Sequence, residues 1–388
     1  MKRSRYAPLM LASLLLLLSS CSTAQQRNDT ADLSRFWETS HQWYDINDDD
    51  KIITPLPDKP RYKSTEITSI ADNVLLFQKS NGGWPKNYDM RAILTDEQKQ
   101  AVEKSRSETN TTFDNGATYT QVEYLARVFT RTNDNRYKEG CLRGIDFILA
   151  AQYDNGGWPQ FYPDSRGYRK YITFNDGAMI GVMNLLHGIV NNEPEYAFVD
   201  EARRSRIRHA FEKGIDCILK CQIEEDGVKS VWCQQHDDVD FRPQSARSFE
   251  PAAISNQESA EIVLFLMKLK EPGPAVVAAV QSAVEWFRKS GIHGLRVQIV
   301  AAPATEFIYR KSSDDRIVVA DSSAPPIWPR FSELNTHKPL FCNRDGHPVY
   351  SLAEVERERR VGYAWYTYEP QNVLDKYPKW FKRVSVSK

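Results

Sequence analysis

The sequence lacks a net charge and is poor in glycine, proline and cysteine. Lys plus Arg and Asp plus Glu each number 51 in 388 residues, so no overall field attracts nucleic acid or an acidic membrane surface. The 18 Gly and 20 Pro, beside 41% hydrophobic residues, exclude collagenous, low-complexity and wholly disordered chains. The chain therefore folds, and a polyanionic partner would need a local cluster of basic residues.

Cysteine is too scarce and too scattered for a disulfide scaffold. After Cys21 five cysteines remain, which is an odd number, and no two of them form a Cys-x-x-Cys pair. A zinc site is therefore disfavoured, and we expect most of these side chains to be small buried apolar groups. The five are Cys141, Cys217, Cys221, Cys233 and Cys342.

The longest apolar run lies near the N-terminus, at residues 8–18 behind a basic start. It is too short for a stable membrane span and is typical of a secretory signal. The run ends in Leu-Ser-Ser-Cys, which resembles the bacterial lipobox, so Cys21 is the expected lipid-bearing first mature residue. Simple cleavage near Ala24 is the alternative. We expect an exported lipoprotein at the outer membrane or cell surface, with residues 22–62 as a tether whose acidic residues 45–50 are solvated.

The body of the chain repeats itself with a period of 74 residues. Asn-Gly-Gly-Trp-Pro occurs at 81–85 and returns at 155–159. The third copy has degenerated but keeps the tryptophan, so the series runs Trp84, Trp158, Trp232. Self-similarity of this kind indicates stacked supersecondary units. We favour core packing for the tryptophans over stacking on sugar rings.

Two stretches with helical spacing of apolar residues belong to each repeat, which is therefore a helix pair. The stretches are 122–129, 180–186 and 262–269 for one helix of each pair, and 144–149, 214–219 and 284–287 for the other. Three pairs predict a mainly α fold, a short (α/α)3 toroid of inner helices ringed by outer ones, over residues 63–290. Strand-like alternation at 296–300, 306–310 and 316–319 predicts a smaller, irregular, partly β region over 291–388 that closes a cleft.

A Phe-Asp-Asn-Gly-Ala type segment opens one helix of each pair. The toroid brings these segments to one end, so Asp114, Asn115 and Asp176 should converge there. Carboxylate and carboxamide oxygens suit a hard cation such as Ca²⁺, although an ordinary N-cap and turn is the alternative. The third copy loses the acidic pair and has Arg247 two residues before Phe249. Cation ligands beside an arginine suit an anionic substrate.

These motifs resemble those of the family-ten polysaccharide lyases, the pectate lyases. The resemblance covers residues 65–370 and includes Ala-Arg-Ser-Phe-Glu at 246–250, Trp-Pro-Arg-Phe at 328–331 and Arg-Asp-Gly at 344–346. It implies a calcium-dependent enzyme that cleaves α-1,4-linked polygalacturonate by β-elimination on a helical toroid with a wide cleft. One departure is Ser248-Phe249, where we expect a small residue and tyrosine, and the lost hydroxyl affects at most a subsite contact.

The resemblance also assigns roles by motif. An arginine base is unusual because guanidinium normally stays protonated, so an electrostatic clamp for the enolate is the alternative. Three protein ligands are few for Ca²⁺, and we expect a weak site completed by substrate carboxylates and water. The implied Ca²⁺ ligands are Asp114, Asn115 and Asp176, the base is Arg247, the substrate arginines are Arg330 and Arg344, and Lys86 is a further substrate contact.

Two other functions fit the same residues. A toroidal glycoside hydrolase would use Asp114 and Asp176 as its two carboxyl groups, without a metal. A non-catalytic surface lipoprotein would only bind pectic oligosaccharide through aromatics and arginines. In each case we expect a monomer that touches the membrane only through the lipid. The mixed-charge run at 356–360, with three arginines, is interpreted as a solvated helix or turn.

Overall fold

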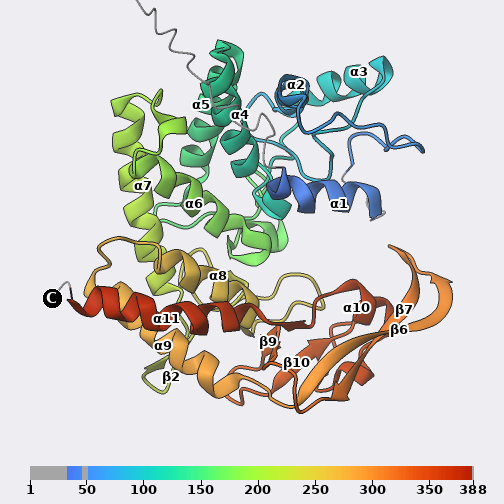
Figure 1. Ribbon diagram of the computed structural model, residues 1–388, viewed down its shortest axis with the longest axis vertical. Coiled ribbons are helices and arrows are strands. Elements are labelled where there is room, and N and C mark those ends of the chain that lie inside the picture. The colour runs from blue at the N-terminus through green and yellow to red at the C-terminus, as the bar shows by residue number, and fades with distance from the viewer. Residues whose placement is uncertain (1–32, 46–50, 387–388) are drawn as a thin grey trace, which may run out of the picture.

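The computed structural model of the chain describes residues 33–45 and 51–386. Helices dominate these ranges, and most strands are short (Figure 1). The expected lipid-bearing Cys21 and the acidic residues 48–50 lie outside the described residues. Among the helices within these ranges, none combines the length and the apolar character that crossing a membrane requires.

Three consecutive helix pairs build the body of the molecule (Figure 1). The inner helices are α4 (Tyr119–Thr132), α6 (Ala178–Val190) and α8 (Asn256–Leu266), and the outer helices are α5 (Asn135–Ala151), α7 (Glu201–Lys220) and α9 (Pro274–Ser290). Each inner helix packs on the next inner helix, and each outer helix on the next outer one. The predicted toroid of inner helices ringed by outer ones is therefore confirmed. Before the first pair come α2 (Ile67–Phe77), which packs on α4 and α5, and α3 (Asp96–Lys104).

The outer helices begin where the local sequence specifies a helix start. The Asp134 carboxylate accepts a hydrogen bond from the backbone N–H of Arg136 at the start of α5, and Asp200 does the same for Arg203 in α7. These side chains satisfy N–H groups that have no partner within the helix. Helix α9 instead begins with Pro274, whose missing N–H costs nothing at this position.

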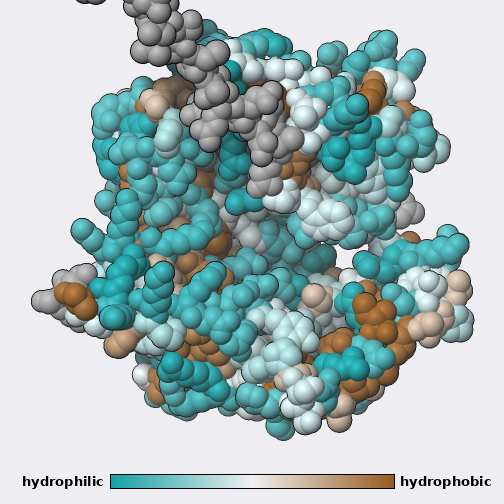
Figure 2. All heavy atoms as spheres, in the orientation of Figure 1, coloured by the Kyte–Doolittle hydropathy of each residue, from teal (hydrophilic) through white to brown (hydrophobic). Residues whose placement is uncertain are grey.

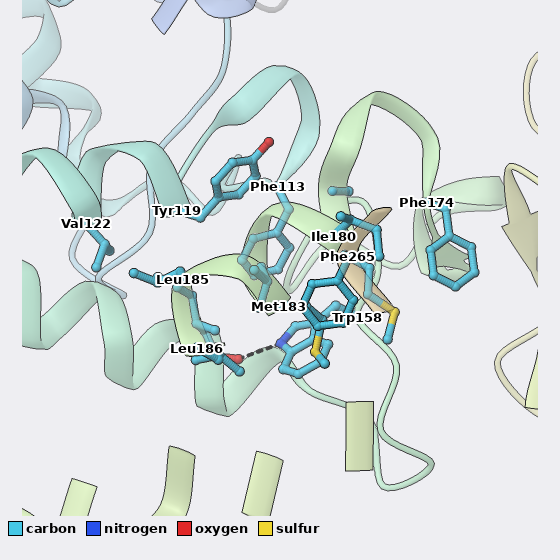
Figure 3. Packing of buried hydrophobic residues seen from close by; sticks show 14 of the residues in the cluster. Phe113, Tyr119, Val122, Trp158, Phe174, Ile180, Met183, Leu185, Leu186 and Phe265 are labelled. Carbon is cyan, nitrogen blue, oxygen red and sulfur yellow. Dashed lines mark hydrogen bonds between the residues drawn. The ribbon is translucent and has the colours of Figure 1, made fainter. Parts of the chain in front are cut away.

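The three repeat tryptophans hold each helix pair to the loop that follows it. All three are fully buried, and each indole N–H donates to a carbonyl of the preceding helix at 2.7 to 2.8 Å. Figure 3 shows Trp158 inside the core together with Phe113 and Phe174. Since a buried indole needs both apolar contacts and an acceptor, these positions explain the repeat. The tryptophans are core residues, as predicted.

The Asn-Gly-Gly-Trp loops approach the neighbouring outer helix too closely for a side chain. Gly156 has a φ of +94°, and a Cβ added there would lie 2.1 Å from the carbonyl oxygen of Lys213 in α7. Gly82, its counterpart in the first repeat, has a φ of +96° and would meet the carbonyl of Arg143 at 2.5 Å. Only glycine adopts this backbone and leaves this space.

Replacing Gly156 by alanine should therefore destabilise the fold by about 2–3 kcal/mol, because backbone strain at positive φ adds to a clash with main-chain atoms. Urea unfolding measures the loss. Gly167→Ala is the matched control, since Gly167 also has a positive φ, +56°, but nothing lies within 4 Å of an added Cβ. Equal losses for both variants would show that the close approach carries no penalty.

The N-terminal segment is folded where the structure describes it. Helix α1 (Trp37–Asp45) follows a single 3₁₀ turn, and the side chains of Phe36 and Trp43 are buried in the main core. The indole of Trp43 donates to the carbonyl of Ile53 at 2.9 Å. The prediction of a tether over 22–62 is therefore wrong for residues 33–45. The segment is polar on average, and the prediction gave no weight to Phe36 and Trp43, which are seven positions apart and therefore fall on one helical face.

The C-terminal region contains a long antiparallel hairpin, β6 (Leu295–Glu306) and β7 (Lys311–Ala320), which rises on the right of Figure 1 toward α1. Its register pairs Leu295 with Ala320 and shifts between Ala301 and Thr305. The predicted strands at 296–300 and 316–319 are confirmed. The strand predicted at 306–310 is wrong, since all but its first residue form the turn of the hairpin.

Short strands connect the third repeat to this region. A four-stranded sheet has the order β11-β10-β9-β5, so β5 beside α8 pairs with C-terminal strands. The remaining short strands form two-stranded pairs. Their bounds are β1 (Ile172–Thr173), β2 (Glu224–Glu225), β3 (Val228–Lys229), β4 (Gln235–His236), β5 (Ile254–Ser255), β8 (Trp328–Pro329), β9 (Phe331–Ser332), β10 (Pro339–Cys342), β11 (Pro348–Val349) and β12 (Tyr366–Thr367).

The last helix, α11 (Glu369–Val386), returns to the helical body and packs on α8 and α9. The last part of the region predicted at 291–388 therefore packs on the helical body and does not belong to a separate C-terminal unit. Helix α10 (Arg357–Gly362) lies against β7 instead. Figure 2 shows the surface hollowed between the part that contains α1 and the part that contains α10 and the hairpin. The five described cysteines are buried, as expected.

Candidate active site

Two tight turns, Asp114–Gly116 and Asn175–Gly177, precede the inner helices α4 and α6 and pack against each other. In each turn the second residue has a left-handed backbone, with φ of 52° for Asn115 and 49° for Asp176. Asn and Asp tolerate this conformation better than most residues. The order Asp-Asn in one turn and Asn-Asp in the other gives each turn one carboxylate. The three predicted cation ligands therefore come together.

Both oxygens of the Asp114 carboxylate accept hydrogen bonds. Lys86 Nζ lies 2.9 Å from Oδ2, and Gln160 Nε2 lies 2.9 Å from Oδ1. Lys86 and Gln160 occupy the same repeat position, two residues after a tryptophan. Burial alone would raise the pKa of Asp114, but Lys86 and Arg247 hold it below its usual value. Asp114 is thus an ionised carboxylate at neutral pH.

The second turn is supported in the same way by the third repeat. The side-chain amide of Gln234, two residues after Trp232, lies 2.9 Å from Oδ1 of Asn175. The Asn175 amide in turn donates to Asp176 Oδ2 at 2.8 Å. In both turns, the residue two positions after the next tryptophan contacts the first side chain of the turn. Each turn is therefore completed by the repeat that follows it.

Asp176 faces solvent but lies in a concave region that is densely surrounded by protein. Desolvation and the nearby Asp114 carboxylate raise the pKa of Asp176, and Arg330 and Arg247 only partly oppose this. Two carboxylates within electrostatic reach of each other favour a bound cation. A cation bound at this pair would relieve the repulsion that raises the pKa of Asp176.

Arg247 comes from the third repeat and is held by a carboxylate. Its Nε and Nη2 lie 2.7 and 2.5 Å from the two oxygens of Glu250, and its guanidinium lies 4.9 Å from the ring centre of Phe249. Glu250 is buried and also accepts from the Tyr363 hydroxyl at 3.0 Å. The surrounding protein disfavours a charge on Arg247, but Glu250 outweighs this and raises the pKa of Arg247 well above its usual value. In this arrangement Arg247 is a cation.

Arg330 lies behind the two turns. Its side chain is buried, and Nη2 donates to Asn175 Oδ1 at 2.9 Å and to Glu258. The guanidinium lies 4.5 Å from the ring centre of Tyr363. Burial opposes the charge, but Glu258 raises the pKa of Arg330. Arg330 therefore supplies a fixed positive charge directly behind Asn175.

Arg344 lies in an adjoining cluster. Its Nε and Nη2 bind the two oxygens of Glu358 at 2.7 and 2.9 Å, and its guanidinium lies 4.4 Å from the ring centre of Tyr309 at the hairpin turn. Arg344 and Arg247 both lie near the buried ring of Phe249, with ring-to-guanidinium distances of 5.4 and 4.9 Å. The same aromatic ring therefore contacts both arginines.

The helix expected at 356–360 is confirmed by α10, but its arginines are paired with other groups rather than solvated, so that part of the prediction is wrong. Arg359 is only 4% exposed and donates twice to Glu358 at 2.8 and 2.9 Å. Arg360 forms a two-pronged pair with Asp315 of β7, at 2.7 Å for both bonds. Arg357 donates to the carbonyl of Pro303 in β6. These contacts attach the hairpin to α10, an arrangement that the local sequence does not reveal.

The donor set at the turns fits Ca²⁺. Within 33–45 and 51–386, no group of three or more His, Cys, Asp or Glu residues could hold a metal ion. A cation at the two turns would be held by Asp114 and Asp176 together with neutral oxygens. Asn115 offers one, and the buried Oε1 of Gln160 has no hydrogen-bond partner in the described structure. Such oxygens suit a hard cation and suit zinc poorly.

Sequence reasoning missed the residues that hold the predicted ones in place. These are Gln160 beside Asp114, Glu250 beside Arg247, Glu258 beside Arg330 and Glu358 beside Arg344. A signal existed for two of them. Gln160 stands at the repeat position of Lys86, and Glu250 lies three residues after Arg247 in the quoted motif.

Comparison with known proteins identifies relatives of this chain. The family model described as pectic acid lyase matches residues 78–374. A family 10 polysaccharide lyase from Cellvibrio cellulosa is 30% identical, with a TM-score of 0.68, over 81% of this chain and 92% of that chain. A point mutant of the Cellvibrio cellulosa lyase, solved in complex with trigalacturonic acid, gives the same values. No match was found among curated proteins. The toroid, the converging turns and this match over most of the chain together show that the protein belongs to the pectic acid lyase family and is a pectate lyase.

Proposed function

We propose that this lyase uses Ca²⁺ and that Asp114, Asn115 and Asp176 are its protein ligands. The observation that carries the proposal is the convergence of two carboxylates from two repeats beside an arginine from the third. The similar lyase from Cellvibrio cellulosa binds trigalacturonic acid, and we carry that substrate class over to this site. The substrate is then α-1,4-linked polygalacturonate, and the products are unsaturated oligogalacturonides.

The chemistry explains why the site needs positive charge. β-Elimination removes the proton on C5, which is α to an ionised carboxylate and therefore very weakly acidic, and expels the oxygen on C4. Ca²⁺, when bound, would neutralise that carboxylate and stabilise the enolate-like charge that develops. Asp114 and Asp176 hold the cation, while Lys86, Arg247 and Arg330 supply fixed positive charge around it.

Arg247 acts at the reacting centre in one of two ways. To act as the base, Arg247 must first lose a proton, and its two hydrogen bonds to the Glu250 carboxylate disfavour that loss. To act as a clamp for the enolate, Arg247 keeps both hydrogen bonds and its positive charge. The resting geometry favours the clamp, and the base role requires that bound substrate displace Glu250 or that a second cation come close. Both roles act mainly in the transition state.

Arg344 and Arg330 remain the proposed substrate arginines, with Lys86 as a third contact. Glu358 and Glu258 hold the two guanidiniums in fixed orientations. A side chain fixed in advance loses less entropy when it binds a uronate carboxylate. Lys86 has three N–H donors, so it can donate to the Asp114 carboxylate and to a substrate carboxylate at the same time.

We also propose that the enzyme is exported and anchored through a lipid on Cys21, at the outer membrane or cell surface, and that it acts as a monomer. The basic start and apolar run at residues 8–18 support export. A polysaccharide of plant cell walls is reached from outside the cell, which agrees with that location.

Incubation of the purified protein with polygalacturonate tests the proposal. We expect ultraviolet absorbance from the unsaturated product, loss of that signal with a calcium chelator, and recovery when excess Ca²⁺ is added. Undiminished rates in the chelator would contradict the calcium requirement. New reducing ends without absorbance would indicate the glycoside hydrolase alternative, and binding without either signal would indicate a binding protein.

A further inference from the structure

Helix α11 carries basic residues on its exposed side that the reaction does not use. From position 376 to its end at Val386, the helix contains four basic residues and no acidic one. All four are exposed, and at 3.6 residues per turn their positions fall on one side of the helix. We call this group the basic face. It consists of Lys376, Lys379, Lys382 and Arg383.

The other side of α11 holds the basic face in place. Trp380 and Val384 are buried on that side, and the helix packs on α8 and α9. Arg383 Nη2 also donates to the carbonyls of Met267 and Leu269, at 2.9 and 3.0 Å. The basic face therefore belongs to the packed helical body of the molecule.

Little negative charge offsets the basic face. One carboxylate, that of Asp375, directly precedes it on the exposed side of α11. Within the part of the chain that the structure describes, no ion pair joins a lysine of the basic face to a carboxylate. On the outer helix α7, by contrast, the exposed Arg206 and Arg208 form ion pairs at 3.3 and 2.5 Å. In a chain with no net charge, the local excess on α11 suits an anionic partner.

The helix dipole does not account for the lysines. Cations stabilise the negative end of a helix, but this effect falls off within the last turn. Arg383 is the basic residue of the last turn of α11. Because the three lysines precede that turn, their positions indicate a partner outside the chain.

Exposed apolar side chains accompany the basic face at the end of the helix. Val386 is 79% exposed and Phe381 is 40% exposed. Val386 follows Lys382 by four residues and Lys379 by seven, so it lies on the same face as both. Figure 2 shows hydrophobic surface at this end of α11. Basic residues together with exposed apolar ones are typical of a helix that lies on a lipid surface.

We propose that the basic face docks on a membrane surface that carries anionic lipid headgroups. The proposal rests on the proposed lipid anchor, which would keep the protein beside such a surface. Residues 22–32 join Cys21 to the described chain, and a segment of that length spans at most about 40 Å. Since the lipid confines the folded body to this distance, even a weak attraction by four cations is effective. This contact adds to the lipid, which the sequence alone predicts as the only link to the membrane.

Docking through α11 would orient the cleft. Figure 1 places the C-terminal end of α11 on the left and the hairpin of β6 and β7 on the right. The hollowed surface between the part with α1 and the part with the hairpin lies on the right in Figure 2. The hollow therefore faces away from a membrane that contacts the basic face, and a polymer reaches it from the open side.

Co-sedimentation of the unlipidated polypeptide from residue 22 onward with lipid vesicles tests the proposal. This polypeptide contains every described residue. We expect binding to vesicles that contain phosphatidylglycerol, little binding to phosphatidylcholine alone, and a steep loss of binding as salt screens the charges. Lys379→Glu/Lys382→Glu should weaken binding to the anionic vesicles by roughly tenfold or more, since two attractions become repulsions.

Lys99→Glu/Lys104→Glu is the matched control, because it makes the same change in net charge at two exposed residues of α3, which lies apart from α11 in Figure 1. The control should bind vesicles as the wild type does, and circular dichroism should show wild-type helix content in both variants. Equal vesicle binding by the two variants, or binding that does not depend on phosphatidylglycerol, would overturn the proposal. If Lys379→Glu/Lys382→Glu weakens adsorption to insoluble polygalacturonate but not to vesicles, the basic face serves the polymer and the proposal is wrong.

The proposed lyase function is tested separately from the docking. Lys379 and Lys382 lie outside the proposed site, so their double variant should form unsaturated product from soluble polygalacturonate at the wild-type rate. Wild-type protein that binds anionic vesicles but forms no such product would contradict the lyase chemistry and leave the docking in place.

Discussion

Arg247→Ala should lower kcat by several orders of magnitude and change substrate affinity far less. In both proposed roles Arg247 acts on the charge or the proton transfer of the transition state, and interactions made only there affect kcat rather than binding. Positioned proton transfer and electrostatic stabilisation are each worth about a hundredfold or more. Initial rates on polygalacturonate, together with calorimetric affinity for trigalacturonate, measure the two effects.

Arg247→Lys should rescue little. Lysine keeps the charge but loses the planar fork that binds both oxygens of Glu250, so the cation would no longer be held in place. Arg242→Ala is the matched control, because Arg242 lies five residues away and its side chain is 80% exposed. A raised KM with kcat near normal in Arg247→Ala would make Arg247 only a carboxylate anchor. The base would then be sought among Lys86, Arg330 and Arg344.

Asp176→Ala should remove most activity and shift the calcium requirement upward by on the order of tenfold to a hundredfold, as loss of a ligand or of its support does in other metal sites. The helical fold should remain intact, since Asp176 faces solvent and its side chain accepts from the neighbouring Asn175. Calcium titration of the initial rate measures the shift, and thermal melting followed by circular dichroism checks the fold.

Asp154→Ala serves as the control for a lost carboxylate, since Asp154 is an exposed residue of the second repeat, just before its Asn-Gly-Gly-Trp loop. Its calcium requirement should match wild type. Activity of Asp176→Ala at low calcium would show that Asp176 is not a ligand. In that case Asp114 and the free oxygen of Gln160 would be examined next.

The helical body and the convergence of the turns could be predicted from the sequence, because the tryptophans recur every 74 residues and a similar turn motif precedes one helix of each pair. Trp84 and Trp158 mark the helix junctions, and Asp114 and Asp176 follow them after 30 and 18 residues, each just before an inner helix. What could not be predicted depends on contacts between distant segments. Arg330 binds Glu258, 72 positions earlier, and nothing near either residue in the sequence specifies the other.

The N-terminal helix and the hairpin escaped prediction for related reasons. Helix α1 is polar on average, so its composition does not indicate that it packs on the site. Its Thr39 hydroxyl nevertheless donates to the carbonyl of Asn115 at 2.6 Å, and this segment therefore supports a proposed cation ligand. The alternation at 306–310 is that of a strand, but the chain reverses there and places Tyr309 under Arg344. In both places tertiary contacts decide the structure.

The contact of each turn with the repeat that follows it has a consequence for how the three copies could diverge. Gln160 completes the turn of Asp114, and Gln234 completes that of Asn175. The third copy is followed by Trp328, whose indole donates to the carbonyl of Phe287 in α9 at 3.0 Å, as the repeat tryptophans do to their own preceding helices. Two residues later stands Arg330, where the second and third repeats have a glutamine, and its guanidinium contacts Asn175. One repeat position thus supplies Lys86, Gln160, Gln234 and Arg330 in turn, so a single exchange of side chain changes both the charge and the hydrogen bonding that the turns receive.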